Sequence, residues 1–304
     1  MGRVLALLLL GVLLCTLPAT AATNYGTGKF YIVGMGTAPD LITVRGAQVV
    51  KDADIILLEE PSERDYWQSF IGDKEVWFCA HGSRVGFGMD PKNVPDPDVR
   101  AIVEKNAKIR QNTIDKIQQA VAAGKTIVAM EGGDPMVYGT TFYLELLPKD
   151  FPSEIVPGIG AFNACSAAVK WSPTFGRDTN SVIITMGDFP GRTDTNEKLM
   201  ATQTSLVIYG MGIKFPVLFE QLQRHYPPNT PVAVVCFAGD REKQQVLRST
   251  VSRFLSEVDY QQLPNDSWTM MVGKFLEVGQ GRVDALLGAG KTEARREHGG
   301  TPTK

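Results

Sequence analysis

The sequence predicts an α/β protein composed of two α/β domains, and three features of the chain support this prediction. Apolar runs of strand length alternate with helix-like stretches over residues 24–150, an order typical of a mainly parallel sheet. Around residues 148–157 the chain becomes rich in Pro and Gly, and a second α/β series follows. Glycine-rich loops stand where apolar runs pass into helices. We therefore expect one domain over 24–150 and another over 151–287.

The first domain contains four expected strands and one long helix. The helix, over about 97–123, has a clear beginning, because Asp96 can cap it and Pro97 suits its first position. We interpret Arg110 of this helix as a solvated side chain. The core-facing side carries, at helical spacing, Ile114, Ile117 and Val121. The strands are expected near residues 30–33, 54–58, 75–79 and 126–130.

The second domain contains further expected strands, followed by a polar tail. The strands fall near residues 181–186, 205–209, 231–237 and 269–275. The tail, residues 288–304, is rich in glycine and charge, so we expect it to be disordered. A P-loop-like sequence at 288–292 has neither a strand before it nor an apolar helix after it, and we interpret it as part of the tail.

The composition argues against two classes of function. The chain has 304 residues and 43% apolar content, enough for a large core, and its 31 basic residues are balanced by 33 acidic ones. A protein dedicated to nucleic acid usually carries a basic excess, so we expect no nucleic-acid partner. The four cysteines show no metal-site spacing, and we expect no metal. Three of them lie in apolar surroundings and are interpreted as small buried residues: Cys79, Cys165 and Cys236.

The N-terminal segment has the features of a secretory signal peptide. A basic start precedes an apolar run over residues 4–17, and small residues follow over 18–23. The run is shorter than the roughly 20 apolar residues of a transmembrane helix. We therefore expect a signal peptide over 1–22, cleaved after Ala21 or Ala22, and an exported or periplasmic protein without a stable membrane span. The alternatives are a retained membrane anchor and a cytoplasmic location.

Two glycine-rich loops, far apart in the chain, have the clearest chemical meaning. The first reads GMGTAPDLIT at 34–43 and the second EGGDPMVYG at 131–139, each directly after an expected strand. Ligands of open α/β sheets bind outside the carboxyl ends of the strands, and glycine lets the backbone approach a ligand closely. A third segment, VPGIGAF, follows at 156–162. The two loops therefore indicate two halves of one ligand site.

Each loop also has a simpler interpretation. The first could be a dinucleotide fingerprint with Glu59 or Glu60 as the ribose-binding acid, although Pro39 stands where that fingerprint has its third glycine. It could also be a strand-to-helix turn that uses glycine for geometry alone. In the second loop, Asp134 is of a residue type common in turns. The position of this loop after a buried strand favours a ligand site.

Together these segments resemble the tetrapyrrole methylase family, the S-adenosylmethionine-dependent methyltransferases of corrin and sirohaem synthesis. The family's loops read roughly G-x-G-P-G-x-P-x-L-[LI]-T, G-D-P-x-[IV]-[YF]-G and V-P-G-[IV]-[ST]-[AS]. The second loop matches almost completely. The first is shorter, with Thr37 and Ala38 in place of Pro-Gly-x, and Gly160 replaces the Ser or Thr of the third.

The likeness continues in the second domain. The segment SLVIYGM at 205–211 stands in for the family's T-[LV]-V-[LI]-[YF]-M. The segment TPVAVV at 230–235 matches a family strand, and MVG at 271–273 is similar to its final I-V-G. The resemblance therefore covers residues 29–280, nearly all of the chain after the expected signal peptide.

The resemblance implies a two-domain α/β methyltransferase with S-adenosyl-L-methionine in a cleft between the domains, a tetrapyrrole substrate of the precorrin or corrin type, and a homodimer. It also implies that the second loop holds the methionine portion of the cofactor. Methyl transfer from a sulfonium depends on positioning, so no catalytic dyad is expected and the catalytic residues stay unknown. The residues implied in cofactor binding are Gly34, Gly36, Thr37, Pro39, Gly132, Gly133, Asp134, Val137, Tyr138, Gly160, Ala161, Gly210, Met211 and Ala238.

Three residues are candidates for a catalytic or substrate-binding role by position. His81 and Arg84 open a Gly-rich insertion at 80–95 that could cover a substrate, and they could pair with tetrapyrrole carboxylates. The alternative for His81 is an ordinary surface loop. Asp188 follows an expected strand and could face the cleft.

A signal peptide conflicts with a cofactor that is made and used in the cytoplasm. The segment could anchor a cytoplasmic enzyme, or the cofactor could be supplied outside. A third hypothesis is an exported, non-enzymatic ligand-binding protein that keeps the methylase fold, and the altered first loop with Thr37 and Ala38 fits it. The intact second loop favours the enzyme.

Overall fold

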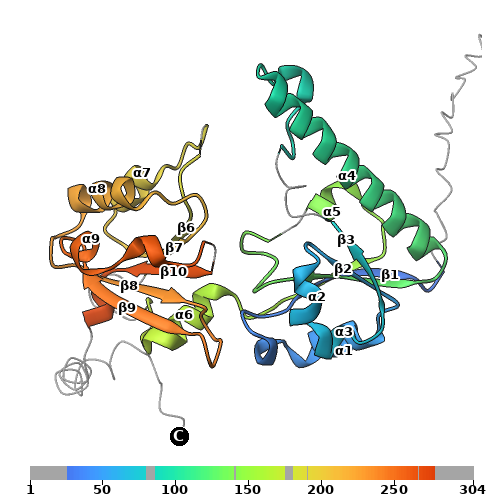
Figure 1. Cartoon of the computed structure of the whole chain (residues 1–304), viewed down its shortest axis with the longest axis horizontal. Helices are drawn as coiled ribbons and strands as arrows, with labels where there is room; N and C mark the ends of the chain where they lie inside the picture. The colour runs from blue at the N-terminus through green and yellow to red at the C-terminus, as the bar shows by residue number, and fades with distance from the viewer. Residues whose placement is uncertain are drawn as a thin grey trace, which may run out of the picture.

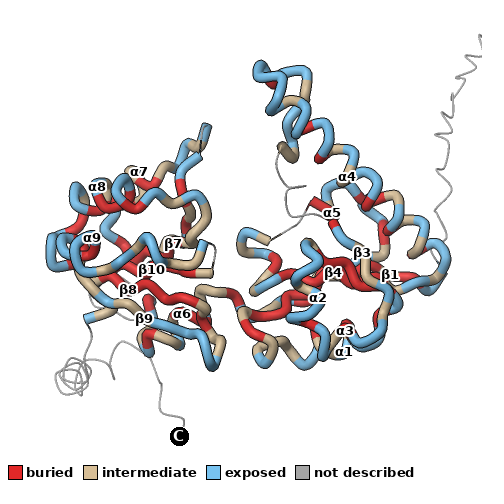
Figure 2. Tube along the Cα trace, viewed as in Figure 1, coloured by how far each residue is buried: buried red, intermediate tan, exposed pale blue. Residues whose placement is uncertain are grey.

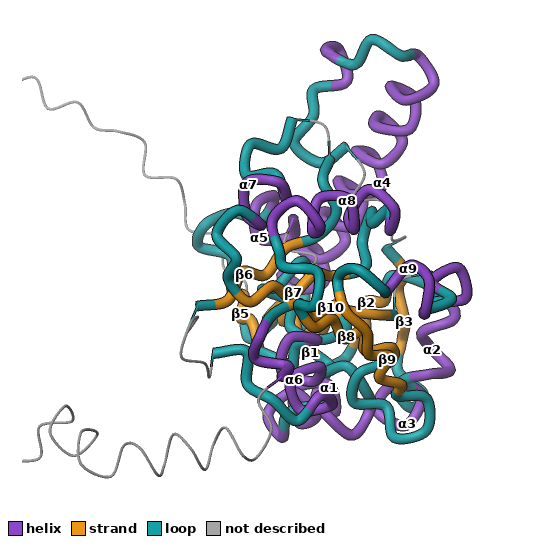
Figure 3. The backbone as a smooth tube through the Cα atoms, turned by 90° about the vertical axis from the view of Figure 1, so that its left-hand side faces the viewer, coloured by secondary structure: helices purple, strands orange, loops and turns teal. Residues whose placement is uncertain are grey.

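The computed structural model describes residues 26–79, 86–139, 142–174, 181–189, 191–265 and 267–277. The chain forms two five-stranded sheets that lie side by side (Figure 1). They are joined by the segment between β5 (Ser153–Val156) and α6 (Ala161–Val169). The central strands form the buried layer of each unit (Figure 2), and helices lie on both sides of the sheets (Figure 3).

The first sheet is entirely parallel, as the alternation of strands and helices predicts. Its order is β3-β2-β4-β1-β5. The other strands are β1 (Lys29–Gly34), β2 (Ile55–Leu58), β3 (Glu75–Phe78) and β4 (Thr126–Glu131). One face packs against α4 (Pro97–Ala122) and α5 (Phe142–Leu146), and the other against α1 (Val44–Asp52) and α3 (Gln68–Ile71). Shorter helical pieces are η1 (Pro39–Leu41), α2 (Ser62–Tyr66) and η3 (Pro91–Asn93).

The second sheet is mixed, with the order β6-β7-β10-β8-β9. Only its first pair is parallel, and the remaining pairs are antiparallel. The strands are β6 (Val182–Thr185), β7 (Ser205–Tyr209), β8 (Pro231–Cys236), β9 (Gln245–Thr250) and β10 (Trp268–Val272). One face packs against α8 (Phe215–His225), α9 (Phe254–Glu257) and the end of α7 (Asn196–Met200), and the other against α6 and η5 (Lys274–Glu277). The piece η4 (Tyr260–Gln262) follows α9.

Each expected strand is present, and the long helix begins as predicted. The carboxylate of Asp96 accepts the N–H groups of Asp98 and Val99 at the start of α4. The three residues expected on its inner face are buried, as are the cysteines, which are free thiols: Ile114, Ile117, Val121, Cys79, Cys165 and Cys236. These features follow from local pattern because capping and helical periodicity involve neighbours in the chain.

Two strands were not predicted, and one of them lies past the expected domain boundary. β5 pairs with β1, so the first sheet continues beyond residue 150 and the change of sheet follows Val156. β9 pairs with β8 at the far edge of the second sheet. The expected signal peptide at 1–22, the residues His81 and Arg84, and the tail at 288–304 lie outside the described residues.

The interpretation of Arg110 as a solvated side chain is wrong. Arg110 is 5% exposed, and its guanidinium lies 5.4 Å from the centre of the Phe87 ring. Phe87 belongs to the segment before α4 and packs on Phe142 of α5, so residues distant in sequence cover the arginine. This burial lowers the pKa of Arg110 from its ordinary value.

Within the described ranges, no helix combines the length and the apolar character that crossing a bilayer requires.

Candidate functional site

The two glycine-rich loops are bonded directly to each other. β1 and β4 are parallel neighbours, so their following loops leave the same edge of the sheet. The N–H of Gly133 donates to the carbonyl of Gly36 at 2.8 Å, and the N–H of Gly36 donates to the carbonyl of Gly133 at 3.2 Å. The φ angle is +76° at Gly36 and +72° at Gly133, in the left-handed region that favours glycine. The two loops, expected to form one ligand site, are therefore joined by two reciprocal backbone hydrogen bonds.

The third glycine segment closes against the first two. It follows β5, the other neighbour of β1. A Cβ atom on Gly34 would lie 2.5 Å from the nitrogen of Gly158 and 2.8 Å from the carbonyl oxygen of Gly133. The backbones of the three glycine segments are thus in contact at Gly34, where a larger residue would clash. Gly34 is needed for this packing.

A cavity of about 560 Å³ lies between the two sheets and is lined in part by these loops. Of the residues implied in cofactor binding, the cavity is lined by Gly36, Thr37, Gly132, Gly133, Asp134, Val137, Gly160, Ala161, Gly210, Met211 and Ala238. Gly34 and Pro39 are not among its lining residues. The structure therefore brings both sheets and the segment between them to a single cavity.

Aromatic side chains that the sequence did not single out make up much of the remaining wall. They are Tyr66, Trp67, Tyr209, Phe237 and Trp268. Tyr209 stands in a family-like segment, but the others come from a short helix and from strand ends, where an aromatic residue usually indicates core. The hydroxyl of Tyr209 accepts the N–H of Phe162 at 3.2 Å, and burial raises the pKa of Tyr209 to about 12. Tyr209 therefore remains a neutral phenol at neutral pH.

Asp134 and the first turn of α6 supply charge of opposite sign. The Oδ1 atom of Asp134 accepts the N–H of Met136 at 2.8 Å, which shapes the turn, and the residue is partly exposed to the cavity. α6 begins at Ala161, and its N-terminus carries partial positive charge. The cavity therefore presents a carboxylate, which suits a cationic group, and a helix N-terminus, which suits an anionic one.

A second cavity of about 530 Å³ adjoins the first and shares Ser62, Glu63, Gly132 and Val137 with it. Its wall is acidic and contains Glu59, Glu60, Glu63 and Glu131. The Oε2 atom of Glu63 accepts the N–H groups of Glu59 at 2.8 Å and Glu60 at 3.0 Å. Burial raises the pKa of Glu63. Glu59 and Glu60 directly follow β2, Glu131 ends β4, and Glu63 lies in α2. The sequence suggested only a ribose-binding role for Glu59 or Glu60.

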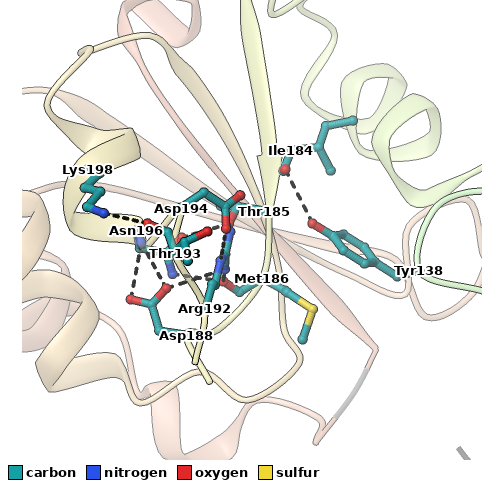
Figure 4. A network of polar contacts seen from close by, with 10 residues as sticks. All are labelled: Tyr138, Ile184, Thr185, Met186, Asp188, Arg192, Thr193, Asp194, Asn196 and Lys198. Carbon is teal, nitrogen blue, oxygen red and sulfur yellow. Dashed lines mark hydrogen bonds and ion pairs between the residues drawn. The ribbon is translucent and has the colours of Figure 1, made fainter. Parts of the chain in front are cut away.

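Tyr138 lines the second cavity, not the first. Its φ is +61°, and its ring meets the Tyr209 ring edge-on at 5.2 Å between centres. Its hydroxyl donates to the carbonyl of Ile184 on β6 at 3.4 Å (Figure 4). Tyr138 therefore reaches from the loop after β4 of the first sheet to β6 and Tyr209 of the second.

Asp188 has a structural role. Its carboxylate accepts the N–H of Asn196 at the start of α7, at 2.9 and 3.2 Å, and lies 3.5 Å from Arg192 (Figure 4). Arg192 in turn donates to Thr185 and to the carbonyl of Met186. Asp188 lines neither cavity, so the structure does not bring this candidate to the site. No cluster of three metal-ligating side chains occurs in the described part of the chain.

The turn after β8 closes one end of the first cavity. A Cβ on Gly239 would lie 2.5 Å from Leu41 and 2.8 Å from the Thr37 hydroxyl, and Arg241 forms an ion pair with Asp40 at 2.5 Å. The Oγ1 atom of Thr37 is buried without a hydrogen-bond partner. The shortened first loop is thus in close contact with the second unit.

Comparison with known proteins agrees with this arrangement. The family model of the Tetrapyrrole (Corrin/Porphyrin) Methylases matches residues 29–254. The uroporphyrinogen-III C-methyltransferase of Bacillus subtilis is 30% identical over 250 residues, covering 79% of this chain and 88% of that protein. The siroheme synthase of Hahella chejuensis is 28% identical over 248 residues, 78% of this chain, and the chain spans 48% of its length.

The fold also matches a solved structure, the uroporphyrin-III C-methyltransferase of Thermus thermophilus in complex with S-adenosyl homocysteine. The TM-score is 0.59 at 19% identity, with 83% of this chain and 100% of that chain covered. The family model runs from β1 to the start of α9 and so includes every strand of both sheets except β10. The chain therefore belongs to the tetrapyrrole (corrin/porphyrin) methylase family.

Proposed function

We propose that the chain is an S-adenosylmethionine-dependent methyltransferase that acts on a tetrapyrrole of the precorrin or corrin type, or on a related substrate. One observation carries this proposal: the intact Gly-Asp-Pro loop lines a cavity that both sheets build. Two relatives that match more than three quarters of this chain are named as a uroporphyrinogen-III C-methyltransferase and a siroheme synthase.

The residues of the first cavity fit the cofactor. Its volume lies in the range of ligand sites, roughly 300–1,000 Å³. Asp134 and the N-terminus of α6 offer opposite charges to an aminocarboxylate. A Cβ on Gly132 would meet nothing within 4 Å, so the backbone of this loop is open to a ligand. The aromatic wall offers apolar surface to a nucleoside.

The protein's own part in the reaction is mainly positional. A bound S-adenosylmethionine would supply the methyl group of its sulfonium, with the neutral thioether S-adenosylhomocysteine as the leaving group. The chain must hold the methyl group and the accepting carbon in line, and such alignment provides much of the acceleration. Glu63 lines both cavities and burial raises its pKa, so its carboxylate could accept the proton that a methylated carbon loses.

Calorimetry of the purified protein tests cofactor binding. S-adenosylhomocysteine and S-adenosylmethionine should each bind at one site per chain, and transfer of labelled methyl to uroporphyrinogen III or a precorrin should follow. Binding without transfer to any tetrapyrrole would favour the alternative, a ligand-binding protein that keeps the fold, which the altered first loop at Thr37 and Ala38 supports. Absence of cofactor binding would refute the enzyme.

Export and a homodimer are further proposals. The apolar run at 4–17 and the small residues at 18–23 support export, and the family resemblance supports the homodimer. Light scattering of the purified protein should give the mass of two chains. A single-chain mass at working concentration would refute the dimer.

A further inference from the structure

We propose that the turn between β8 and β9, residues 237–244, is a clasp that closes one end of the first cavity and must open for the cofactor to exchange. In the clasp, this turn contacts the first glycine-rich loop, residues 34–43. The inference rests on the function proposed above and adds a conformational step to it. The clasp joins the two units of the fold across the cavity.

The turn is held together by its own hydrogen bonds. The Oδ1 atom of Asp240 accepts the N–H groups of Glu242 at 2.9 Å and Lys243 at 3.0 Å. The side chain of Gln244 accepts the N–H of Gly239 at 2.7 Å. Because these bonds close the turn on itself, we expect it to move as one body against the first loop.

The turn contacts the first loop at Gly239. A Cβ atom there would lie 2.5 Å from Cδ1 of Leu41 and 2.8 Å from Oγ1 of Thr37. The φ angle of Gly239 is +88°, in the left-handed region that favours glycine. The loop is shorter than the family pattern at Thr37 and Ala38. A short loop and a residue without a side chain thus allow the two units to approach closely.

One exposed ion pair joins the turn and the loop outside the cavity. The Nε atom of Arg241 lies 2.5 Å from Oδ2 of Asp40, with the side chains 86% and 43% exposed. Neither residue lines the cavity. Tyr66 of α2 does line it, and burial, together with the nearby carboxylates of Asp240 and Asp40, raises the pKa of Tyr66. Exposed ion pairs stabilise weakly, so this pair can break readily.

Closure of the clasp has a cost at Thr37. The Oγ1 atom of this residue is buried and has no hydrogen-bond partner among the described residues. A buried polar group without a partner is destabilising, because the same group is hydrogen-bonded to water when exposed. A close contact and a weak ion pair therefore favour the closed clasp, and a buried hydroxyl opposes it. This balance suits a contact that opens and closes.

Both sides of the clasp line the cavity. The first loop contributes Gly36 and Thr37, and the turn contributes Phe237, Ala238 and Asp240. Separation of the turn from the loop therefore widens the cavity at this end. If the cofactor passes there, its association and release rates both rise with the fraction of molecules in which the clasp is open. The dissociation constant then changes little, because it is the ratio of the two rates.

The experiment measures both rates for S-adenosylhomocysteine. Labelled ligand chased by unlabelled ligand gives release, and the approach to equilibrium gives association. Arg241→Asp should raise both rates about threefold and keep the dissociation constant within about twofold, since repulsion replaces a weak attraction. Adding Asp40→Arg reverses the pair and should return both rates to near wild type. Arg253→Asp is the matched control, because its exposed partner, Glu257, lies in the same unit, and it should leave both rates unchanged.

Thr37→Val should change the rates in the opposite direction. Valine has the shape of threonine without the hydroxyl, so the closed clasp no longer leaves a polar group unpaired. We expect both rates to fall about threefold. Faster release with a matching loss of affinity would instead make the Thr37 hydroxyl a ligand contact and would overturn the proposed cost of closure.

The remaining outcomes separate the clasp from the proposed function. Wild-type rates in Arg241→Asp would show that the cofactor exchanges without opening this end of the cavity, and would overturn the clasp. A change in release alone, without a change in association, would also overturn it, because a clasp acts on both rates. Absence of S-adenosylhomocysteine binding to wild type would overturn the proposed function, and this inference with it.

Discussion

Gly34 and Gly158 are in backbone contact so close that a Cβ atom on Gly34 would lie 2.5 Å from the Gly158 nitrogen. The nearby Gly133 carbonyl leaves no room on the other side, at 2.8 Å. Both neighbouring atoms belong to the backbone, which cannot move aside as a flexible side chain can. The glycine-rich loops are therefore locked to one another before any ligand is bound.

Gly34→Ala should destabilise the fold, because the added methyl group forces these backbones apart. We expect the free energy of unfolding to fall by about 2 kcal/mol, as in other overpacked interiors. Urea unfolding followed by circular dichroism measures this change. Gly132→Ala is the matched control, since its Cβ would meet nothing within 4 Å. That control should keep wild-type stability and weaken cofactor binding, and equal stability of the two variants would contradict the prediction.

Asp134→Asn and Asp134→Ala should both weaken S-adenosylmethionine binding at least tenfold, ~1.4 kcal/mol. Asn keeps an oxygen that can accept the Met136 N–H and so preserves the turn, but it removes the charge that suits the cofactor's ammonium group. Calorimetry gives the affinities, and thermal unfolding confirms that both variants fold. Asp188→Asn, a carboxylate away from both cavities, should keep the affinity. Wild-type affinity in Asp134→Asn would show that the loop recognises no charge.

Glu197 should make stability depend on pH in the acid range. Its carboxylate accepts hydrogen bonds from Arg224 at 2.6 and 3.1 Å and lies 2.6 Å from the His225 ring. These partners lower the pKa of Glu197 from 4.5 to about 2. Because the folded pKa is depressed, the stabilisation is complete above about pH 4.5 and is lost as the pH falls toward 2.

Glu197→Gln removes this titration. Its unfolding free energy should be lower than that of wild type at pH 7, and the difference should shrink as the pH approaches 2. Urea unfolding at pH 7, 4 and 3 measures it, with Glu104→Gln on the exposed side of α4 as control. A difference from wild type that stays constant over this range would refute the assignment to Glu197.

The native N-terminus of the protein should be Ala22 or Thr23. The triplets at 19–21 and 20–22 carry the small residues that signal peptidase requires. N-terminal sequencing of the natively expressed protein decides this. Replacing Ala21 and Ala22 together by Leu should block cleavage and leave the longer chain. Recovery of wild-type protein that begins at Met1 would indicate an anchor or a cytoplasmic enzyme.

Some features that sequence alone could not decide depend on contacts between distant segments. β5 and β9 are edge strands of mixed character, SEIV and QVLRST, without the continuous apolar run of a central strand. Arg110 lies on an amphipathic helix, and its burial results from contact with Phe87, which the helix sequence does not reveal. Asp134 and Asp188 both follow strands, yet one lines the cavity and the other caps α7.

The sequence by itself determined the family, the central strands, the capped start of α4 and the three glycine loops. Each of these features depends on residues that are adjacent in the chain and interact locally. The tertiary structure alone decided that Tyr138 contacts Tyr209 and Ile184 of the second sheet and that Trp268 covers Gly210. Such relationships depend on strand register and on the approach of two sheets. A residue's neighbours across a ladder or a cavity are set by the whole fold, and no short stretch of sequence specifies them.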